Sequence, residues 1–292
     1  MPSRHDDGGR LANRVSVRRD GVVLSCLDGG SGDDVIVLLH GLAGSGRELV
    51  PTAEALLPER HVIVVDQRGH GYSTRRPQDL SRRAYVEDVV AVVEQLAGGV
   101  PVTVVGQSMG GHTALLFAAE YPELVRRLVL LEGGVGGRED RGDYPAELGD
   151  FFASWPVPFA DVRQAAEFLG DTPIAQAWLR DLDRCPDGLW PRFEPEVMRV
   201  AIGAVAARAR WDEWQRVKVP TLLVLGEHGI IPAAEVQRML SLRPDVEQVV
   251  VPGAGHDVHL EERDVWVRVL RQFLTSIPAK EPPRRRATPR GG

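Results

Sequence analysis

The apolar residues of this chain fall into short unbroken runs that are rich in valine and leucine, and each run ends at or near a glycine. The runs are Val35 to Gly41, Val62 to Gly71, Val102 to Gly106, Leu128 to Gly134, Thr221 to Glu227 and Gln248 to His256. Continuous β-branched runs of this length are typical of strands buried on both faces, as in a parallel sheet. Ahead of them, Val15 to Arg18 and Val22 to Cys26 flank Asp20-Gly21, which predicts a hairpin.

Between these runs, apolar residues recur every three or four positions, which predicts amphipathic helices. Such segments are Ser81 to Leu96, Met109 to Glu120, Ala233 to Leu242 and Glu262 to Leu274. The alternation of strands and helices predicts an α/β protein with a mostly parallel, doubly wound sheet. In such sheets the functional residues gather at the carboxyl ends of the strands.

The alternation stops between Gly137 and Val217, where prolines, acidic residues and large aromatics accumulate without a valine-rich strand. The aromatics are Phe151, Phe152, Trp155, Phe159, Phe168, Trp178, Trp190, Phe193, Trp211 and Trp214. We therefore expect a helical cap at residues 137–217, inserted into a core made of residues 15–136 and 218–276. Residues 1–14 and the proline-rich, basic residues 277–292 have little to bury and are expected to be disordered tails.

Charge and composition narrow the class of protein. The net charge of −6 over 292 residues does not suggest nucleic-acid binding, and the basic tail is better explained as a solvated extension than as a nucleic-acid or membrane arm. Two cysteines, Cys26 and Cys185, provide no disulfide framework and favour a reduced compartment. The N-terminus does not resemble a signal peptide and no run has the length of a membrane span, so a cytoplasmic location is expected.

The segment Gly106-Gln-Ser108-Met-Gly110 stands between a predicted strand and a predicted helix. A serine hydroxyl is a weak nucleophile until a base removes its proton, and a sharp strand-to-helix turn projects it away from the backbone. Such a turn is crowded, so the positions two before and two after the serine need very small residues, and both are glycine. The alternative is that Ser108 only caps the helix. The glycine spacing matches neither a dinucleotide-binding nor a phosphate-binding loop.

An acyl-transfer site at Ser108 would also need a base and two amide donors for an oxyanion. His256 follows the last predicted strand on a Gly-Ala-Gly turn, which places it at the same sheet edge as Ser108 and makes it the candidate base. The donors are expected at Met109, just after the serine, and at Leu42, in the loop after an early strand. His40 of that loop is equally well explained as a structural brace.

At this point the chain resembles the α/β-hydrolase-fold serine hydrolases. The segments LLHGLAGSG, DQRGHGYS, GQSMGG and GAGHDVHLEE occur in the family's order and spacing, from about Val15 to Leu274. The resemblance implies an enzyme without cofactors, a cap domain at 137–217 and His256 as general base. A serine at the nucleophile position argues against epoxide hydrolysis and dehalogenation, for which this family uses aspartate.

The third catalytic group departs from the family pattern. The family usually places an aspartate after the penultimate strand in a Gly-x-x-Asp stretch, and here that position is Gly229. Two carboxylates could orient His256 instead: Glu132, which ends the strand after the serine helix, and Glu227, which lies in the usual loop. We favour Glu132, because some members of the family carry the acid there and a strand-end carboxylate needs a partner.

These residues predict a serine hydrolase that cleaves an ester, thioester or lactone of an apolar or aromatic small molecule. The aromatic cap favours such a substrate, although the same aromatics could form the core of the cap itself. Alternatives are a cofactor-free perhydrolase or haloperoxidase-like enzyme with the same residues, and a non-catalytic ligand-binding protein on this fold. His259, with Asp257 and Glu261, could hint at a metal site, but a His-x-x-His pair on a loop (His256 and His259) without a clear third ligand is a weak signal, so no metal site is expected.

Overall fold

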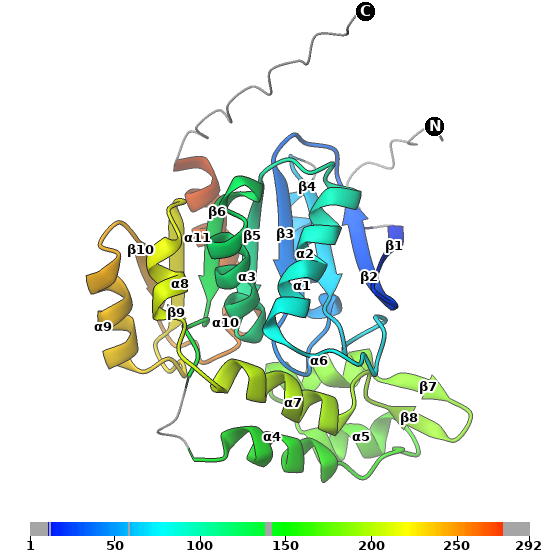
Figure 1. Cartoon of the computed structure of the whole chain (residues 1–292). Coiled ribbons are helices and arrows are strands. Elements are labelled where there is room, and N and C mark those ends of the chain that lie inside the picture. Colours follow the sequence, from blue (N-terminus) through cyan, green and yellow to red (C-terminus); the bar gives the residue numbers. More distant parts are fainter. Residues whose placement is uncertain (1–10, 12, 58, 138–141, 277–292) are drawn as a thin grey trace, which may run out of the picture.

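A central sheet with helices on both faces and a helical insertion at one end make up the computed structural model, which describes residues 11, 13–57, 59–137 and 142–276 (Figure 1). The sheet has eight strands in the order β1-β2-β4-β3-β5-β6-β9-β10. They are β1 (Asn13–Arg19), β2 (Val22–Gly29), β3 (Val35–Leu39), β4 (His61–Asp66), β5 (Val102–Gln107), β6 (Val125–Leu131), β9 (Thr221–Gly226) and β10 (Glu247–Val251). Only the pairs β1–β2 and β2–β4 are antiparallel. The predicted mostly parallel α/β sheet is therefore confirmed.

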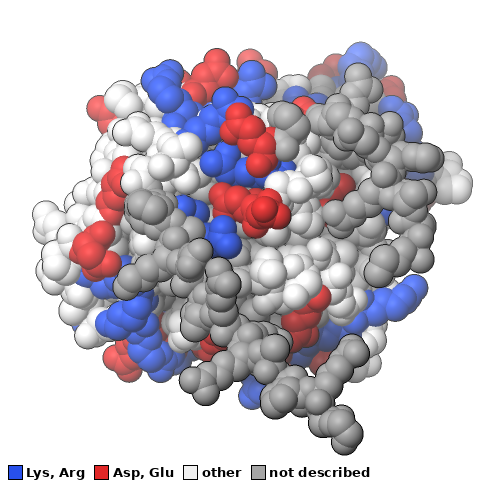
Figure 2. Space-filling model, turned by 90° about the horizontal axis from the view of Figure 1, so that it is seen from above, with Lys and Arg blue, Asp and Glu red and all other residues white. Residues whose placement is uncertain are grey.

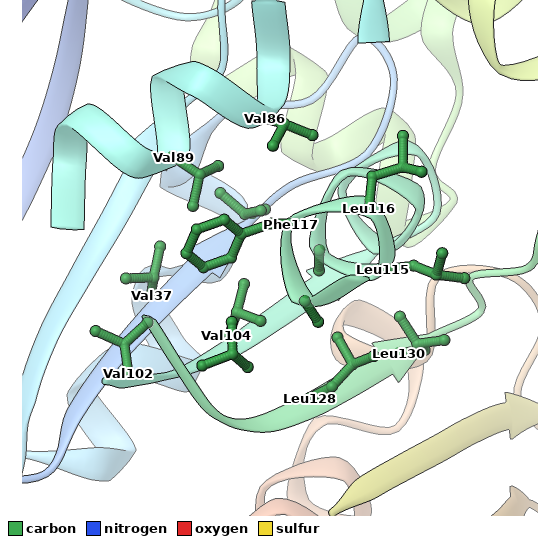
Figure 3. Close-up of a cluster of buried hydrophobic side chains, with 14 of the residues drawn as sticks. Val37, Val86, Val89, Val102, Val104, Leu115, Leu116, Phe117, Leu128 and Leu130 are labelled. Carbon is green, nitrogen blue, oxygen red and sulfur yellow. The ribbon is translucent and has the colours of Figure 1, made fainter. Parts of the chain in front are cut away.

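The helices of the core divide between the two faces of this sheet. One buried cluster joins the sheet to α2 (Arg82–Leu96), α3 (Met109–Glu120), α8 (Trp211–Arg216) and α9 (Ala233–Leu242). The other joins it to α1 (Gly46–Leu56), α10 (Val258–Glu261) and α11 (Arg263–Ser276). Figure 3 shows Phe117 of α3 extending between Val89 of α2 and the valines of β3 and β5. Because strands β3 to β6 are buried on both faces, their sequences are almost continuously apolar.

The predicted hairpin at Asp20-Gly21 is confirmed, since Arg19 pairs with Val22 and both turn residues have positive φ, 45° and 75°. Strand β1 begins at Asn13, two residues before the expected start. Its first two residues face solvent on an edge strand, so they show no apolar alternation. The remaining residues of the two expected disordered tails, 1–10, 12 and 277–292, lie outside the described residues.

Helix α1 was not among the predicted helices. Its sequence contains Pro51, which breaks the apolar pattern that would have indicated a helix. The N-terminus of the helix is nevertheless capped, because the Ser45 side chain accepts a hydrogen bond from the Arg47 N–H. The Asp66 carboxylate accepts a second bond from the Gly46 N–H at 2.7 Å. Asp66 therefore serves a structural purpose at the end of β4.

The insertion contains α4 (Tyr144–Ala153), α5 (Val162–Leu169), α6 (Pro173–Asp181), the hairpin β7 (Asp183–Cys185) and β8 (Gly188–Trp190), and α7 (Pro195–Ala206). It lies at the carboxyl ends of the parallel strands (Figure 1). Its aromatic rings pack mainly on one another: Phe152 and Phe193 are 4.9 Å apart and Trp155 and Trp178 5.3 Å apart. Trp214 differs, because it is buried in the core under the sheet and donates to the Met239 carbonyl.

The opposite end of the molecule carries charges of both signs side by side (Figure 2). At the amino ends of the strands, Asp34 forms ion pairs with Arg60 at 3.2 Å and Arg126 at 3.1 Å. Neighbouring charges of opposite sign cancel over short distances, so these pairs add little long-range field. Within the described ranges, no helix has both the length and the apolar character needed to cross a lipid bilayer.

Candidate active site

Ser108 lies at the sharp turn between β5 and α3, with φ 50° and ψ −116°. Positive φ is unfavourable for a residue with a side chain, and such strain persists only where the surrounding structure enforces it. Here the Ser108 N–H donates to the Leu131 carbonyl and the His112 N–H donates to the Ser108 carbonyl. The side chain makes no capping hydrogen bond to the described helix, so the interpretation of Ser108 as a simple N-cap is not supported.

The flanking glycines allow the turn to form. A Cβ on Gly106 would lie 2.2 Å from the Gly110 carbonyl oxygen, and a Cβ on Gly110 would lie 2.4 Å from the Leu39 carbonyl oxygen. Both obstacles are backbone atoms, which cannot rotate away as a side chain could. The requirement for glycine at these positions is therefore steric, as the sequence pattern predicted.

Replacing Gly106 by alanine should lower stability by about 1–3 kcal/mol, because the new methyl group forces the backbone of the turn apart. The matched control is Gly203→Ala in α7, where the added Cβ meets only Pro145 at an ordinary 3.9 Å. That change should be neutral or stabilising by up to about 1 kcal/mol. Urea unfolding of both variants tests this, and equal stability losses would contradict it.

The loop after β3 lies against Ser108. A Cβ on Gly41 would be 3.4 Å from Ser108 Cβ, and the side chains of Leu42 and Met109 share one apolar cluster with Tyr85. The two segments chosen for the oxyanion donors are thus adjacent, as expected for one site.

His40 is fully buried in the same loop and has a bracing role. Its Nε2 accepts from the Gln67 N–H at 3.0 Å, and its Nδ1 donates to the Gly41 carbonyl at 2.7 Å. The side-chain amide of Gln67 in turn donates to the His40 carbonyl. Both ring nitrogens are hydrogen-bonded to backbone groups, so His40 holds the loop in place and neither nitrogen is available to act as a base.

Glu132 follows β6 with its side chain almost completely buried, 1% exposed. One oxygen, Oε1, accepts from the Gly226 N–H and the other, Oε2, accepts from the Ile230 N–H, both at 2.8 Å. Oε2 also lies 3.3 Å from Nδ1 of His256. Two backbone donors and one imidazole therefore hold this carboxylate in a single orientation.

His256 reaches this carboxylate from the loop after β10. Because Nδ1 donates to Glu132, Nε2 is the nitrogen left to accept a proton. The Gln107 amide nitrogen is 3.4 Å from that Nε2 and 3.3 Å from the His256 carbonyl. Gln107 occupies the variable position before Ser108, and nothing in the sequence pattern had singled it out. It connects the serine turn directly to the histidine.

Of the two candidate acids, Glu132 lies within hydrogen-bonding distance of His256, and Glu227 is hydrogen-bonded to a different loop residue. The Glu227 side chain is exposed and accepts a hydrogen bond from the Gly253 N–H at 2.8 Å. Gly229, where the family pattern would place aspartate, is equally informative, because a Cβ there would lie 1.9 Å from Glu132 Oε1. The space that an aspartate would need is already filled by the Glu132 carboxylate.

The histidine that hinted at a metal site has a different environment. His259 is buried and its Nε2 lies 3.8 Å from a carboxylate oxygen of Glu48. In the part of the chain that the structure describes, no group of three or more His, Cys, Asp or Glu side chains could hold a metal ion.

A cavity opens beside Ser108 between the core and the insertion. Its wall is formed by Ser108, Met109, His112, Glu132, Gly134, Gly136, Tyr144, Ile202, Val205, Ala206, Ile230, Ile231 and Glu235. The insertion contributes Tyr144 from α4 and three aliphatic residues from α7. The buried aromatic cluster around Trp155 is not part of this wall.

A model of the alpha/beta hydrolase fold family matches residues 34–263, and the chain belongs to this family. It is similar to the 2-(acetamidomethylene)succinate hydrolase of Mesorhizobium japonicum, with 27% identity over 279 residues that cover 90% of this chain and 95% of that protein. It is also 29% identical over 251 residues to a pimeloyl-[acyl-carrier protein] methyl ester esterase of Xanthomonas axonopodis pv. citri, covering 83% and 96% of the two chains.

A solved structure supports the same fold. The crystal structure of E-2-(acetamidomethylene)succinate hydrolase matches with a TM-score of 0.77 and 24% identity, over 90% of this chain and 99% of that one. Family membership and these hydrolase and esterase relatives support hydrolysis as the activity, and ester hydrolysis in general terms.

Proposed function

We propose that this protein is a serine hydrolase that cleaves a carboxylic ester, thioester or lactone of an apolar small molecule through an acyl-enzyme. The observation that carries the proposal is the contact of Glu132 Oε2 with His256 Nδ1 at 3.3 Å, at the same sheet edge as the strained Ser108. A carboxylate in this position selects the tautomer in which Nε2 carries no proton and can accept one.

In this mechanism Ser108 Oγ attacks the carbonyl carbon of the substrate while His256 Nε2 takes the hydroxyl proton. Glu132 stabilises the resulting imidazolium, and the amides of Leu42 and Met109 donate to the oxyanion. His256 then gives its proton to the leaving group, which departs and leaves the acyl-enzyme. Water, deprotonated by His256 Nε2, then attacks the acyl carbonyl carbon, and His256 returns the proton to Ser108 Oγ as the bond to the acyl group breaks and the carboxylic acid is released.

The cavity wall supports an apolar acyl or leaving group, since α7 presents Ile202, Val205 and Ala206 to it. The aromatic residues of the insertion give less support for an aromatic substrate, because they pack on each other and form the insertion's own core. We assign residues 137–217 as a cap that covers the site, with α8 joined to the core through Trp214.

A fluorophosphonate probe tests the nucleophile directly. The wild-type protein should be labelled, and Ser108→Ala should abolish labelling because the proposed nucleophile has been removed. The matched control, Ser241→Ala on the exposed part of α9, should be labelled like wild type. An unlabelled wild-type protein would contradict the proposal and favour a non-catalytic ligand-binding protein.

A panel of p-nitrophenyl esters of increasing acyl length, run beside lactones, would then identify the preferred acyl group.

A further inference from the structure

The cavity beside Ser108 is small, with a volume of about 50 Å³. For comparison, an apolar protein cavity of about 150 Å³ holds one benzene molecule, which has six carbon atoms. On that scale the cavity has room for roughly two carbon atoms beyond the carbonyl group that would react at Ser108. A long acyl chain would fit only if one of the walls moved.

The core side of the cavity is fixed. Met109 and His112 lie in the first turns of α3, and each of these residues is only 1% exposed. The carboxylate of Glu132 is held by the backbone N–H groups of Gly226 and Ile230, both at 2.8 Å. Close packing and backbone hydrogen bonds therefore prevent this side from receding when a substrate enters.

The insertion side of the cavity is α7, and the C-terminal end of this helix is hydrogen-bonded to the core. The Gly137 N–H donates to the Val205 carbonyl at 3.1 Å, and the Arg210 N–H donates to the Val135 carbonyl at 2.9 Å. Between these two bonds, a Cβ on Gly136 would lie 2.6 Å from the Val205 carbonyl oxygen, so the two backbones are in close contact. This end of α7 is thus held against the loop after β6.

The side chains of α7 show which residues limit the cavity. Ala201 is buried against Tyr85 and Met109, and Val205 packs on the same cluster. Ile202, which is 4% exposed, and Val205 present branched side chains to the cavity. Because the helix backbone is held in place, the size of these two side chains sets how far a substrate group can extend from Ser108.

We propose that this cavity binds the acyl part of the substrate and selects a short aliphatic acyl group of about two to four carbons, with Ile202 and Val205 setting the limit. The inference rests on the proposed function. In that mechanism the acyl group stays bonded to Ser108 after the leaving group has departed into solvent. The space walled by α3 and α7 therefore suits the acyl group better than the leaving group.

The test measures kcat/KM for the p-nitrophenyl esters of acetate, butanoate, hexanoate and octanoate. Each methylene that the cavity can bury should raise kcat/KM about fourfold, so butanoate should exceed acetate by about tenfold or more. The value should then fall at least about tenfold between butanoate and octanoate, because extra methylenes press against a fixed wall.

Two variants of the wall move this limit in opposite directions. Val205→Ala enlarges the cavity and should shift the optimum from butanoate to hexanoate. Ala206→Leu fills it and should lower kcat/KM for butanoate at least about tenfold relative to acetate. The matched control is Val200→Ala in the same helix, where the residue is 44% exposed, and it should keep the wild-type profile. Ala206→Leu removes no packing, so it keeps the test decisive if Val205→Ala loses stability.

Hydrolysis of the octanoate ester as efficiently as the butanoate ester by wild type, or an unchanged optimum in both wall variants, would overturn the inference. A length dependence found for the alcohol of acetate esters and not for the acyl chain would also overturn it, since the cavity would then hold the leaving group. The proposed function fails separately, if wild type is not labelled by the fluorophosphonate and hydrolyses none of these esters. A labelled, active protein with a flat profile contradicts only the chain-length limit.

Discussion

Replacing Glu132 by glutamine is expected to lower kcat by roughly 10²- to 10⁴-fold while the fold stays intact. Glutamine has nearly the same shape, and its single oxygen can still accept from one of the two backbone N–H groups that Glu132 binds. It no longer carries the negative charge that, in the proposed mechanism, stabilises the imidazolium of His256. Steady-state kinetics with a p-nitrophenyl ester and circular dichroism of the same sample measure the two parts of this prediction.

Glu227→Gln is the matched control for this prediction. The Glu227 carboxylate is exposed and accepts from the Gly253 N–H, and no hydrogen bond or ion pair joins it to His256 among the described residues. Its replacement should change kcat less than about twofold, within the small range typical of surface substitutions. If Glu227→Gln removes activity and Glu132→Gln does not, the assignment of the acid is wrong.

Gly229→Asp should also remove activity, by roughly 10²-fold or more, because the new side chain and the Glu132 carboxylate cannot occupy the same space. The same substitution should become beneficial once Glu132 is removed. In Glu132→Gly the space is empty, and an aspartate at 229 would enter it from the loop where the family usually carries the acid. The double variant Glu132→Gly/Gly229→Asp should be at least about tenfold more active than Glu132→Gly alone.

Values of kcat/KM for wild type, both single variants and the double variant complete this cycle. Purely additive effects, with the double variant as inactive as the product of the two single losses, would show that the two positions do not share one carboxylate site. Glycine is chosen at 132 because Glu132 has φ 46°, a conformation that glycine adopts without strain.

The sheet was predictable because its central strands are buried on both faces and leave long apolar runs that end at the glycines of the site. The serine turn was predictable for a related reason, since both glycines around Ser108 are demanded by backbone atoms only a few residues away in the chain or on the adjacent strand. Helix α1 was missed because Pro51 interrupts its pattern, and its start depends on Asp66, which lies in the next strand.

Parts of the site depend on contacts between distant segments, which a single sequence does not display. The glycine at 229 looked like a missing acid, and only the position of Glu132 Oε1 explains why a side chain is excluded there. Gln107 lies within the serine motif and His112 just after it, yet Gln107 contacts the loop of His256 and His112 packs against the loop of Gly136. The aromatic residues of the insertion were ambiguous because a substrate pocket and a small hydrophobic core require the same residue types.

One hydrogen bond joins the insertion to the loop beside the nucleophile. The indole N–H of Trp178 in α6 donates to the carbonyl of Ala43 at 3.1 Å, and Ala43 itself has φ 56°. Leu42, which carries one of the proposed oxyanion donors, is the residue just before it. A shift of α6 relative to the core would therefore act directly on a peptide in the left-handed region, next to the residue whose amide is the proposed oxyanion donor. The position of α6 and the geometry of the proposed anion-stabilising amide are thus coupled through this contact.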